Sequence, residues 1–184
     1  MKATLNICVF AVLMNTVLLA SGENRPPLRV VPAVDFDRYA GQWYEIARLP
    51  NRFQKRCIGD VTATYELQND GKISVLNRCR VEKGGQIQAK GTAKTAGKEH
   101  PNSVLKVRFA PAILSFIPQV WGDYQIIDLA EDYSYAVVGD PDREFLWILA
   151  RKPSMDDGTY LGLVDRARSQ GFPVDQLEKT DHRE

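Results

Sequence analysis

Short runs in which hydrophobic and polar residues alternate follow one another through most of the chain. Between residues 60 and 67 every second side chain is apolar, and Thr62, Thr64 and Glu66 lie between them. Because successive side chains of a β-strand point to opposite faces, this run predicts a strand with one buried and one solvated face. Similar runs bounded by Gly, Pro, Asp or charged residues predict eight strands in all: residues 42–49, 60–67, 73–79, 86–95, 104–109, 124–129, 134–139 and 145–151. Regular short strands indicate an antiparallel sandwich or a closed barrel, and the periodicity alone does not separate the two.

The pattern changes after Pro153. Ser154, followed by Asp156 and Asp157, is typical of the start of a helix. Apolar residues then recur every three or four positions, and Gly171 is a suitable C-cap. We therefore expect one amphipathic helix that packs on the outside of its own sheet, although such a stripe can also dock on a membrane or a partner. A short tail near residues 175–180 follows it.

The first 22 residues have the features of a signal peptide. Lys2 provides a positive start, residues 7–20 are almost entirely apolar, and small residues suited to cleavage follow. Glu23 and Asn24 stand where a lipid-modified lipoprotein would carry a cysteine. We therefore expect export of the chain and a soluble mature form.

The start of the predicted mature chain is rich in proline. Residues 23–34 contain three prolines, so we expect an extended lead-in rather than a packed element, with one domain over residues 35–184. Once Lys2 has left with the leader, basic and acidic residues are equal in number. This balance gives no reason to expect nucleic acid as a partner.

Two cysteines, Cys57 and Cys79, remain after the predicted leader is removed. In an oxidising compartment we expect them to form a disulfide, and the alternative is two separate buried thiols. Simple hairpin register puts them a few residues out of alignment, so a bond requires the backbone to bend near Cys57.

The chain offers little catalytic chemistry. Its two histidines, His100 and His182, lie in a turn before a proline and in the tail. Neither position suits the base of a catalytic triad inside a cavity. Glu45 is an internal carboxylate candidate, and we expect it to lie buried near Arg151 or a tyrosine. No metal cluster or phosphate-binding loop appears, so we expect no cofactor and no enzymatic activity.

Three sequence patches together resemble the lipocalin family, in particular its bacterial and apolipoprotein D-like branch. They are residues 41–53 (GQWYEIARLPNRF), residues 131–136 (EDYSYA) and residues 145–153 (FLWILARKP). The resemblance implies an all-β fold, an eight-stranded antiparallel up-and-down barrel with one C-terminal helix packed outside. It also implies that the three patches meet at the closed end, where Arg151 covers the ring of Trp43. The residues given this structural role are Gly41, Trp43, Asp132, Tyr133 and Arg151.

A barrel of this kind can enclose one small apolar ligand, and the resemblance points to a fatty acid or a lysophospholipid. Trp147 stands where apolipoprotein D relatives carry a pocket tryptophan. Alternation adds further inward-facing candidates, although each can equally fill the core or face outward: Tyr135, Tyr65, Ala63, Val75, Asn77 and Phe109. Arg52, Lys55 and Arg56, in the loop after the first strand, are candidates for binding a carboxylate or phosphate head group; solvated loop charges are the alternative.

The connection between Phe109 and Trp121 is apolar and is broken by Pro111 and Pro118. It either contacts a membrane while lipid passes in or out, or folds into the mouth and closes the pocket. Its apolar residues are Ile113, Leu114, Phe116, Ile117 and Trp121.

The expected function is binding, storage or transport of a small hydrophobic ligand, for example in envelope lipid maintenance, by a monomer or homodimer. The resemblance implies a periplasmic location, with association with the outer membrane left open. The alternatives are an envelope-associated stress or interaction protein that acts through its surface and the apolar loop, and a lipocalin-type enzyme.

Overall fold

The computed structural model describes residues 25–111, 113 and 120–183. The predicted leader, residues 1–22, lies outside the described residues, as do Leu114, Phe116 and Ile117 of the apolar loop.

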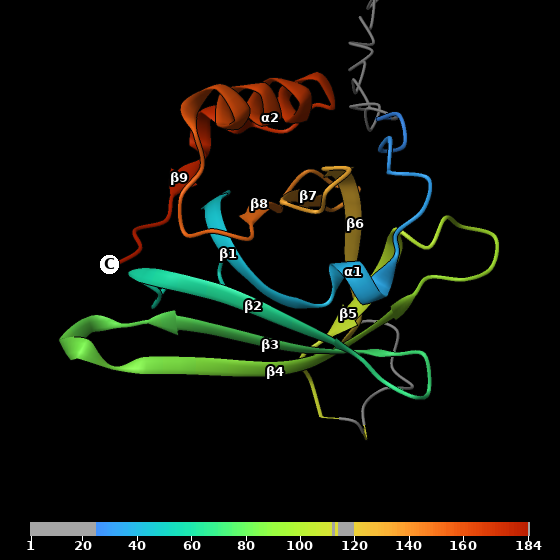
Figure 1. The fold of residues 1–184 in the computed structure, drawn as a ribbon, viewed down its shortest axis with the longest axis horizontal. Helices are drawn as coiled ribbons and strands as arrows, with labels where there is room; N and C mark the ends of the chain where they lie inside the picture. The colour runs from blue at the N-terminus through green and yellow to red at the C-terminus, as the bar shows by residue number, and fades with distance from the viewer. Residues whose placement is uncertain (1–24, 112, 114–119, 184) are drawn as a thin grey trace, which may run out of the picture.

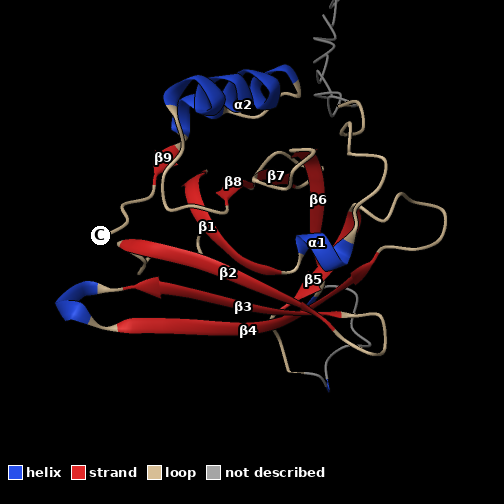
Figure 2. Ribbon diagram, in the orientation of Figure 1, coloured by secondary structure: helices blue, strands red, loops and turns tan. Residues whose placement is uncertain are grey.

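Eight antiparallel strands close into a barrel (Figures 1 and 2). Each strand pairs with the next along the chain, and β1 pairs with both β8 and β2, so the sheet closes on itself and the barrel has no free edge. The strands are β1 (Gly41–Arg48), β2 (Gly59–Leu67), β3 (Ile73–Arg80), β4 (Gln86–Thr95), β5 (Val104–Arg108), β6 (Gly122–Leu129), β7 (Tyr135–Gly139) and β8 (Leu146–Ala150). The prediction of eight strands is confirmed, and the structure decides for a closed barrel rather than a sandwich.

The predicted helix is α2 (Asp157–Ser169), and it lies outside the barrel (Figure 2). The side chain of Asp156 caps it by accepting the backbone N–H of Thr159, so the cap is Asp156 rather than Ser154. Gly171 adopts a positive φ of 89° just beyond the helix, as the C-cap prediction requires. A second helix, α1 (Phe36–Tyr39), was not predicted, because four residues are too few to show a helical period. The structure also contains two short 3-10 helices, η1 (Glu82–Gly84) and η4 (Val174–Gln176).

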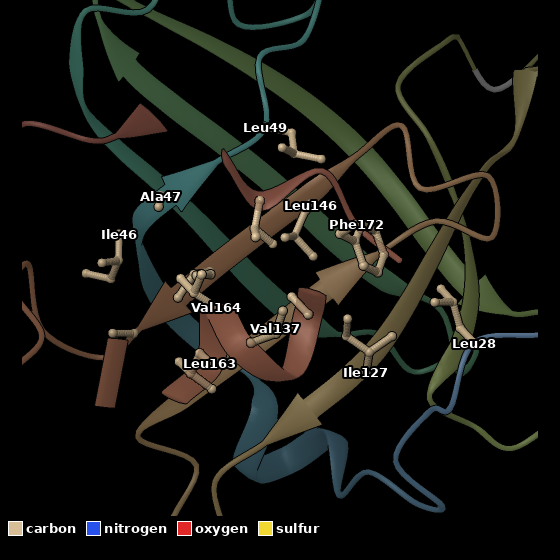
Figure 3. Packing of buried hydrophobic residues seen from close by; sticks show 14 residues of the cluster. Leu28, Ile46, Ala47, Leu49, Ile127, Val137, Leu146, Leu163, Val164 and Phe172 are labelled. Carbon is tan, nitrogen blue, oxygen red and sulfur yellow. The ribbon is translucent and has the colours of Figure 1, made fainter. Parts of the chain in front are cut away.

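The buried hydrophobic residues form two clusters, one on each side of the barrel wall. We call them the barrel core and the helix interface. The barrel core lies inside and includes Trp43, Tyr65, Val75, Val138 and Leu149. The helix interface joins α2 to the outer face of the sheet, where Figure 3 shows Leu163 and Val164 of the helix close to Val137 of β7.

The N-terminal lead-in is packed, contrary to expectation. Leu28 is buried in the helix interface and Val34 in the barrel core. The N–H of Val31 donates to the carbonyl of Ile126 at 3.0 Å, and the hydroxyl of Ser103 donates to the carbonyl of Val31 at 2.5 Å. The prolines therefore prevent a regular strand, but the apolar residues between them still contribute buried surface.

The C-terminal tail fills a gap in the wall. The pairing of β1 with β2 ends at Tyr44 and Thr62, and β9 (Glu178–Lys179) pairs with the end of β1 beyond that point; the pairing of β1 with β8 has a bulge between Glu45 and Ala47. Beyond β9, the carbonyl of Asp181 accepts the N–H of Asp60 on β2 at 2.7 Å. The tail thus bridges β1 and β2 at the open end of the barrel.

Candidate functional site

The closed end of the barrel is sealed by Trp43, whose side chain is fully buried. The guanidinium of Arg151 lies 3.8 Å from the centroid of this ring, which confirms the predicted cation–π contact. It also donates to the carbonyls of Gln42, Arg38 and Tyr39, and its partial burial lowers the pKa of Arg151. Gly41 turns the chain with a φ of 93°. This group is therefore a structural plug.

The second sequence patch meets the first at the same end, as the resemblance implied. The hydroxyl of Tyr133 accepts the N–H of Asp35 at 2.9 Å, and the guanidinium of Arg38 lies 4.1 Å from the Tyr133 ring centroid. Asp132 accepts the N–H of Ser134 in a local turn. These contacts hold the β6–β7 connection against α1 and the start of β1.

Above this plug, three tyrosine hydroxyls form a buried chain. The Tyr124 hydroxyl lies 2.8 Å from that of Tyr39 and 3.0 Å from that of Tyr65. Burial raises the pKa of all three phenols, that of Tyr65 to about 12. The cavity that they line with apolar residues measures about 10 Å³, which is room for roughly one water molecule. The deep half of the barrel is therefore largely filled by side chains.

The open half of the barrel is different, because inward-facing side chains there reach solvent. Ala63, Asn77 and Ala89 pair across β2, β3 and β4, on the side of the sheet that faces the barrel core. Ala63 and Asn77 are half-buried, and Ala89 is exposed. Inward-facing residues that remain exposed indicate that the interior opens to solvent at this level. Ala89 was not among the predicted residues, although the hairpin register, once known, identifies it.

Phe109 lies over the next row of the same wall. This row pairs Tyr65, Val75 and Gly91. A Cβ atom at Gly91 would stand 2.7 Å from the Phe109 ring, so only glycine leaves room for the ring on this inner face. Phe109 is 45% exposed, and it therefore contributes an apolar surface near the mouth. Tyr65, Val75 and Phe109 thus lie on the predicted side of the wall.

Trp147 belongs to the inner face and is half-buried. Its ring stacks on that of Phe145, with centroids 5.8 Å apart, and its indole N–H donates to Gln54 at 2.9 Å. The side-chain amide of Gln54 donates in turn to Glu45 at 2.6 Å. This aromatic pair is thus linked to a polar network at the mouth.

That network is centred on Glu45, which is 2% exposed. Its carboxylate accepts from Arg48 at 3.0 Å and from the hydroxyl of Thr180 at 2.6 Å. The expectation that Glu45 lies near Arg151 or a tyrosine is therefore wrong. The bulge after Glu45 brings Arg48 to the same side of the strand, and sequence alternation alone places these two residues on opposite faces.

Tyr135 does not face the interior as predicted. Its strand partner is Ala150, and both belong to the helix interface, whereas the next pair, Ala136 and Leu149, belongs to the barrel core. Because side chains alternate, placing Leu149 inside places Tyr135 outside. Tyr135 is therefore not a pocket residue.

The apolar loop is described only at its ends. Ile113 is 79% exposed. Trp121 is half-buried against the outer wall, where its ring contacts Lys94 at 4.4 Å and Arg108 at 5.2 Å. The prediction that Trp121 belongs to an exposed apolar lid is wrong, because these two cations hold the ring on the barrel surface.

The loop after β1 carries the predicted head-group residues and the disulfide. Arg52, Lys55 and Arg56 are exposed, and none of them forms an ion pair with a carboxylate of the described part of the chain. Cys57 is bonded to Cys79 with their Cα atoms 5.5 Å apart, which confirms the predicted disulfide. The expected bend is present, because the β2–β3 register shifts just after Gly59.

Within the described ranges, no cluster of three or more His, Cys, Asp or Glu side chains is arranged to bind a metal ion. No helix in this part of the protein has the length and apolar character needed to span a membrane.

Comparison with known proteins identifies the fold and the family. A profile of the lipocalin-like domain matches residues 34–182. The chain is 41% identical over 155 residues to temperature-induced lipocalin-1 of Arabidopsis thaliana, covering 83% of this chain and 82% of that protein. It is 37% identical over 176 residues to the outer membrane lipoprotein Blc of Citrobacter freundii, covering 92% of each. The structure of insecticyanin from the tobacco hornworm Manduca sexta matches with a TM-score of 0.62 at 20% identity and 86% coverage of both chains, which shows the shared fold. The chain therefore belongs to the lipocalin-like family, whose members bind small hydrophobic ligands.

Proposed function

We propose that this protein binds a single-chain lipid, a fatty acid or a lysophospholipid, in the open half of its barrel. The observation that carries the proposal is the solvent-reaching inner wall of small and apolar side chains. Ala63 and Ala89 leave space on this wall, and Phe109, whose ring lies over Gly91, and Trp147 offer large apolar surfaces. Apolar walls with a few polar groups are typical of ligand pockets.

The filled lower half supports a lipid whose polar end stays at the mouth. The tyrosine cavity of about 10 Å³ is too small for a head group, whereas Arg52, Lys55 and Arg56 are exposed in the loop beside the opening. A guanidinium or ammonium group at the rim can pair with a carboxylate or phosphate that remains partly hydrated. The alkyl chain then lies along the apolar wall.

The same proposal includes export to a bacterial envelope and a role in lipid maintenance there. The Blc relatives are outer membrane lipoproteins by name, and the disulfide suits an oxidising compartment. Residues 1–22 provide the export signal in this proposal.

The test is a pair of substitutions on neighbouring positions of β4. Ala89→Phe fills the inner face, and Lys90→Phe adds the same side chain to the outer face. Palmitate and a lysophospholipid are titrated separately while tryptophan fluorescence is followed in a Trp121→Phe background, which removes the outer-face indole. Ala89→Phe should weaken binding at least about tenfold, equivalent to ~1.4 kcal/mol, and Lys90→Phe should leave it unchanged. Equal affinity in both variants would contradict a ligand in the barrel.

A second candidate function, contact with a membrane through the mouth, is favoured by two exposed apolar residues. Phe53 is 65% exposed and Ile113 is 79% exposed. Replacing both by serine should reduce co-sedimentation with phospholipid vesicles, whereas Leu161→Ser, at a position on α2 that is 59% exposed, should not. If the Leu161 variant loses as much association as the double variant, the mouth is not the contact surface.

A further inference from the structure

A cleft of about 190 Å³ lies outside the barrel, between α2, the outer face of β6 and β7, and the N-terminal lead-in. It is far larger than the enclosed cavity among the tyrosines. Figure 1 shows the lead-in, drawn in blue, passing beside the C-terminal end of α2. The lining comprises Arg29, Val30, Val31, Ile127, Asp128, Val137, Leu163, Arg166, Ala167 and Gln170.

The floor of the cleft is apolar because it is an extension of the helix interface. Figure 3 shows Ile127, Val137 and Leu163 side by side in this cluster. Ala167 is the last buried residue of the helical stripe, and its small side chain leaves space between the helix and the sheet. The lead-in is bonded to both sides of the cleft: the N–H of Arg29 donates to the side-chain oxygen of Gln170 on the helix side at 2.8 Å, and the N–H of Val31 donates to the carbonyl of Ile126 on β6 at 3.0 Å. The space is therefore produced by fixed contacts.

Positive charge predominates at the edge. Arg166 pairs with Asp128 at 2.5 Å, but half of its side chain remains exposed. The guanidinium of Arg29 donates to the hydroxyl of Ser169 at 3.1 Å and has no carboxylate partner among the described residues. Two guanidinium groups thus face one carboxylate. The edge of the cleft therefore carries a net positive charge, which attracts an anion.

The end of the helix does not cancel this attraction. The carbonyls of the last turn of a helix carry partial negative charge when they are free. Here the carbonyls of Ala167 and Arg168 accept backbone N–H groups from the residues after the helix, and the carbonyl of Gln170 accepts from Arg143. The nearby negative charge is therefore largely that of Asp128, already paired with Arg166.

We propose that this cleft is a second binding site, separate from the barrel, for a small anionic amphiphile. A short alkyl or aromatic group would lie on the apolar floor, and its carboxylate or sulfate would pair with Arg29 and Arg166. The volume suits a compact ligand, because it is smaller than the roughly 300–1,000 Å³ of sites for drug-sized molecules. The inference does not depend on what the barrel binds.

The test uses octanoate as the probe and octanol as its uncharged counterpart. Binding is followed by NMR of methyl groups, with Val137 and Leu163 reporting on the cleft and Val75 and Val138 reporting on the barrel core. Octanoate should shift the cleft signals in a saturable way, and octanol should do so at least about tenfold more weakly. Absence of saturable shifts at Val137 and Leu163 overturns the site, and equal affinity for octanol overturns its preference for anions.

Matched variants separate the cleft from a general surface effect. Val30→Phe fills the lip of the cleft, and Ala33→Phe places the same ring at an exposed position of the same segment. Arg29→Gln removes the unpaired charge, and Arg25→Gln removes a charge nearby in the lead-in. Val30→Phe should weaken the affinity of the cleft for octanoate about tenfold, and Arg29→Gln should weaken it about threefold. The control variants Ala33→Phe and Arg25→Gln should leave this affinity unchanged. A cleft affinity that stays the same in both Val30→Phe and Arg29→Gln contradicts the proposal.

Discussion

At the closed end of the barrel the polar groups are paired within the chain, whereas in the open half several are not. Arg151 covers Trp43 and donates to neighbouring backbone carbonyls. In the open half, the side-chain oxygen of Asn77 and the Nε of Arg48 are buried without a hydrogen-bond partner in the described part of the protein. Buried polar atoms without partners cost stability, so they are retained where water or a ligand can satisfy them. The closed end is therefore built for stability, whereas the open half holds buried polar groups that water or the proposed ligand can satisfy.

The largest expected difference lies between the two inward-facing tryptophans. Trp43→Ala should lower the free energy of unfolding by about 3–5 kcal/mol, because it empties the plug of a fully buried ring. Trp147→Ala should cost less than about 2 kcal/mol, because this ring is only half-buried, and should weaken lipid binding. Urea denaturation and lipid titration of both variants measure the two effects. If the two variants lost similar amounts of stability, the two ends of the barrel would not differ in the way described.

The open half is expected to depend on its disulfide for order. Replacing Cys57 and Cys79 together by serine opens a loop of 22 residues and should lower the free energy of unfolding by about 3 kcal/mol. Amide exchange should accelerate in the loop after β1 and remain slow around Trp43. Acceleration of equal size at the closed end would show that the two regions do not respond separately.

The tyrosine chain should make the protein sensitive to alkaline pH. Tyr65 has a pKa of about 12 in the folded protein and 10.0 as its ordinary value, so the folded state keeps a proton that the unfolded state loses. Stability is therefore fully present below about pH 10 and falls as the pH rises toward 12, by roughly 2–3 kcal/mol for Tyr65 alone. Tyr65→Phe should make this decline shallower in denaturation curves recorded between these pH values. An unchanged slope would indicate that Tyr65 titrates normally.

The smallest expected effect concerns the tail at the open end. The backbone N–H of Arg183 and the guanidinium of Arg80 hold the pKa of Asp60 below its ordinary value of 3.8. The contribution of this carboxylate is present above that value and is lost as the pH falls through the lower folded pKa. The NMR signal of the Arg183 N–H, which donates to Asp60, should therefore titrate in acid, and Asp60→Asn should abolish the titration.

A carboxylate of the closed end serves as the control for the tail. Asp132, which accepts the N–H of Ser134 in a local turn, also has a lowered pKa. Its titration should leave the tail signals unchanged. A tail that responds equally to Asp132→Asn would contradict the assignment to Asp60.

The sequence allowed most of the fold to be predicted because its strands alternate regularly and its turns carry characteristic residues. The predicted limits of 86–95 coincide with β4, and the other strands agree within two residues at each end. Gly41, Trp43 and Arg151 were placed at the closed end through the resemblance of their sequence patches to the lipocalin family, and the structure shows them there. The candidate site was predicted less well. Tyr65 and Val75 lie on the expected face, but Tyr135 does not. An error of one residue in the assumed alternation moves a side chain from the inner to the outer face of the barrel wall.

The sequence by itself determined the strand and helix segments, because these depend on periodicity and on turn residues, and its three motif patches indicated the closed end through their resemblance to the lipocalin family. Only the tertiary structure decided which polar groups meet. The bulge after Glu45 brings Arg48 beside it, the tail adds Thr180 from far along the chain, and the lead-in meets the end of α2 to form the outer cleft. The contacts of Thr180 and of the lead-in join segments separated by more than 100 residues, and the contact of Arg48 depends on the bulge; no local pattern specifies them, because they follow from how the closed barrel places its strands and connections in space.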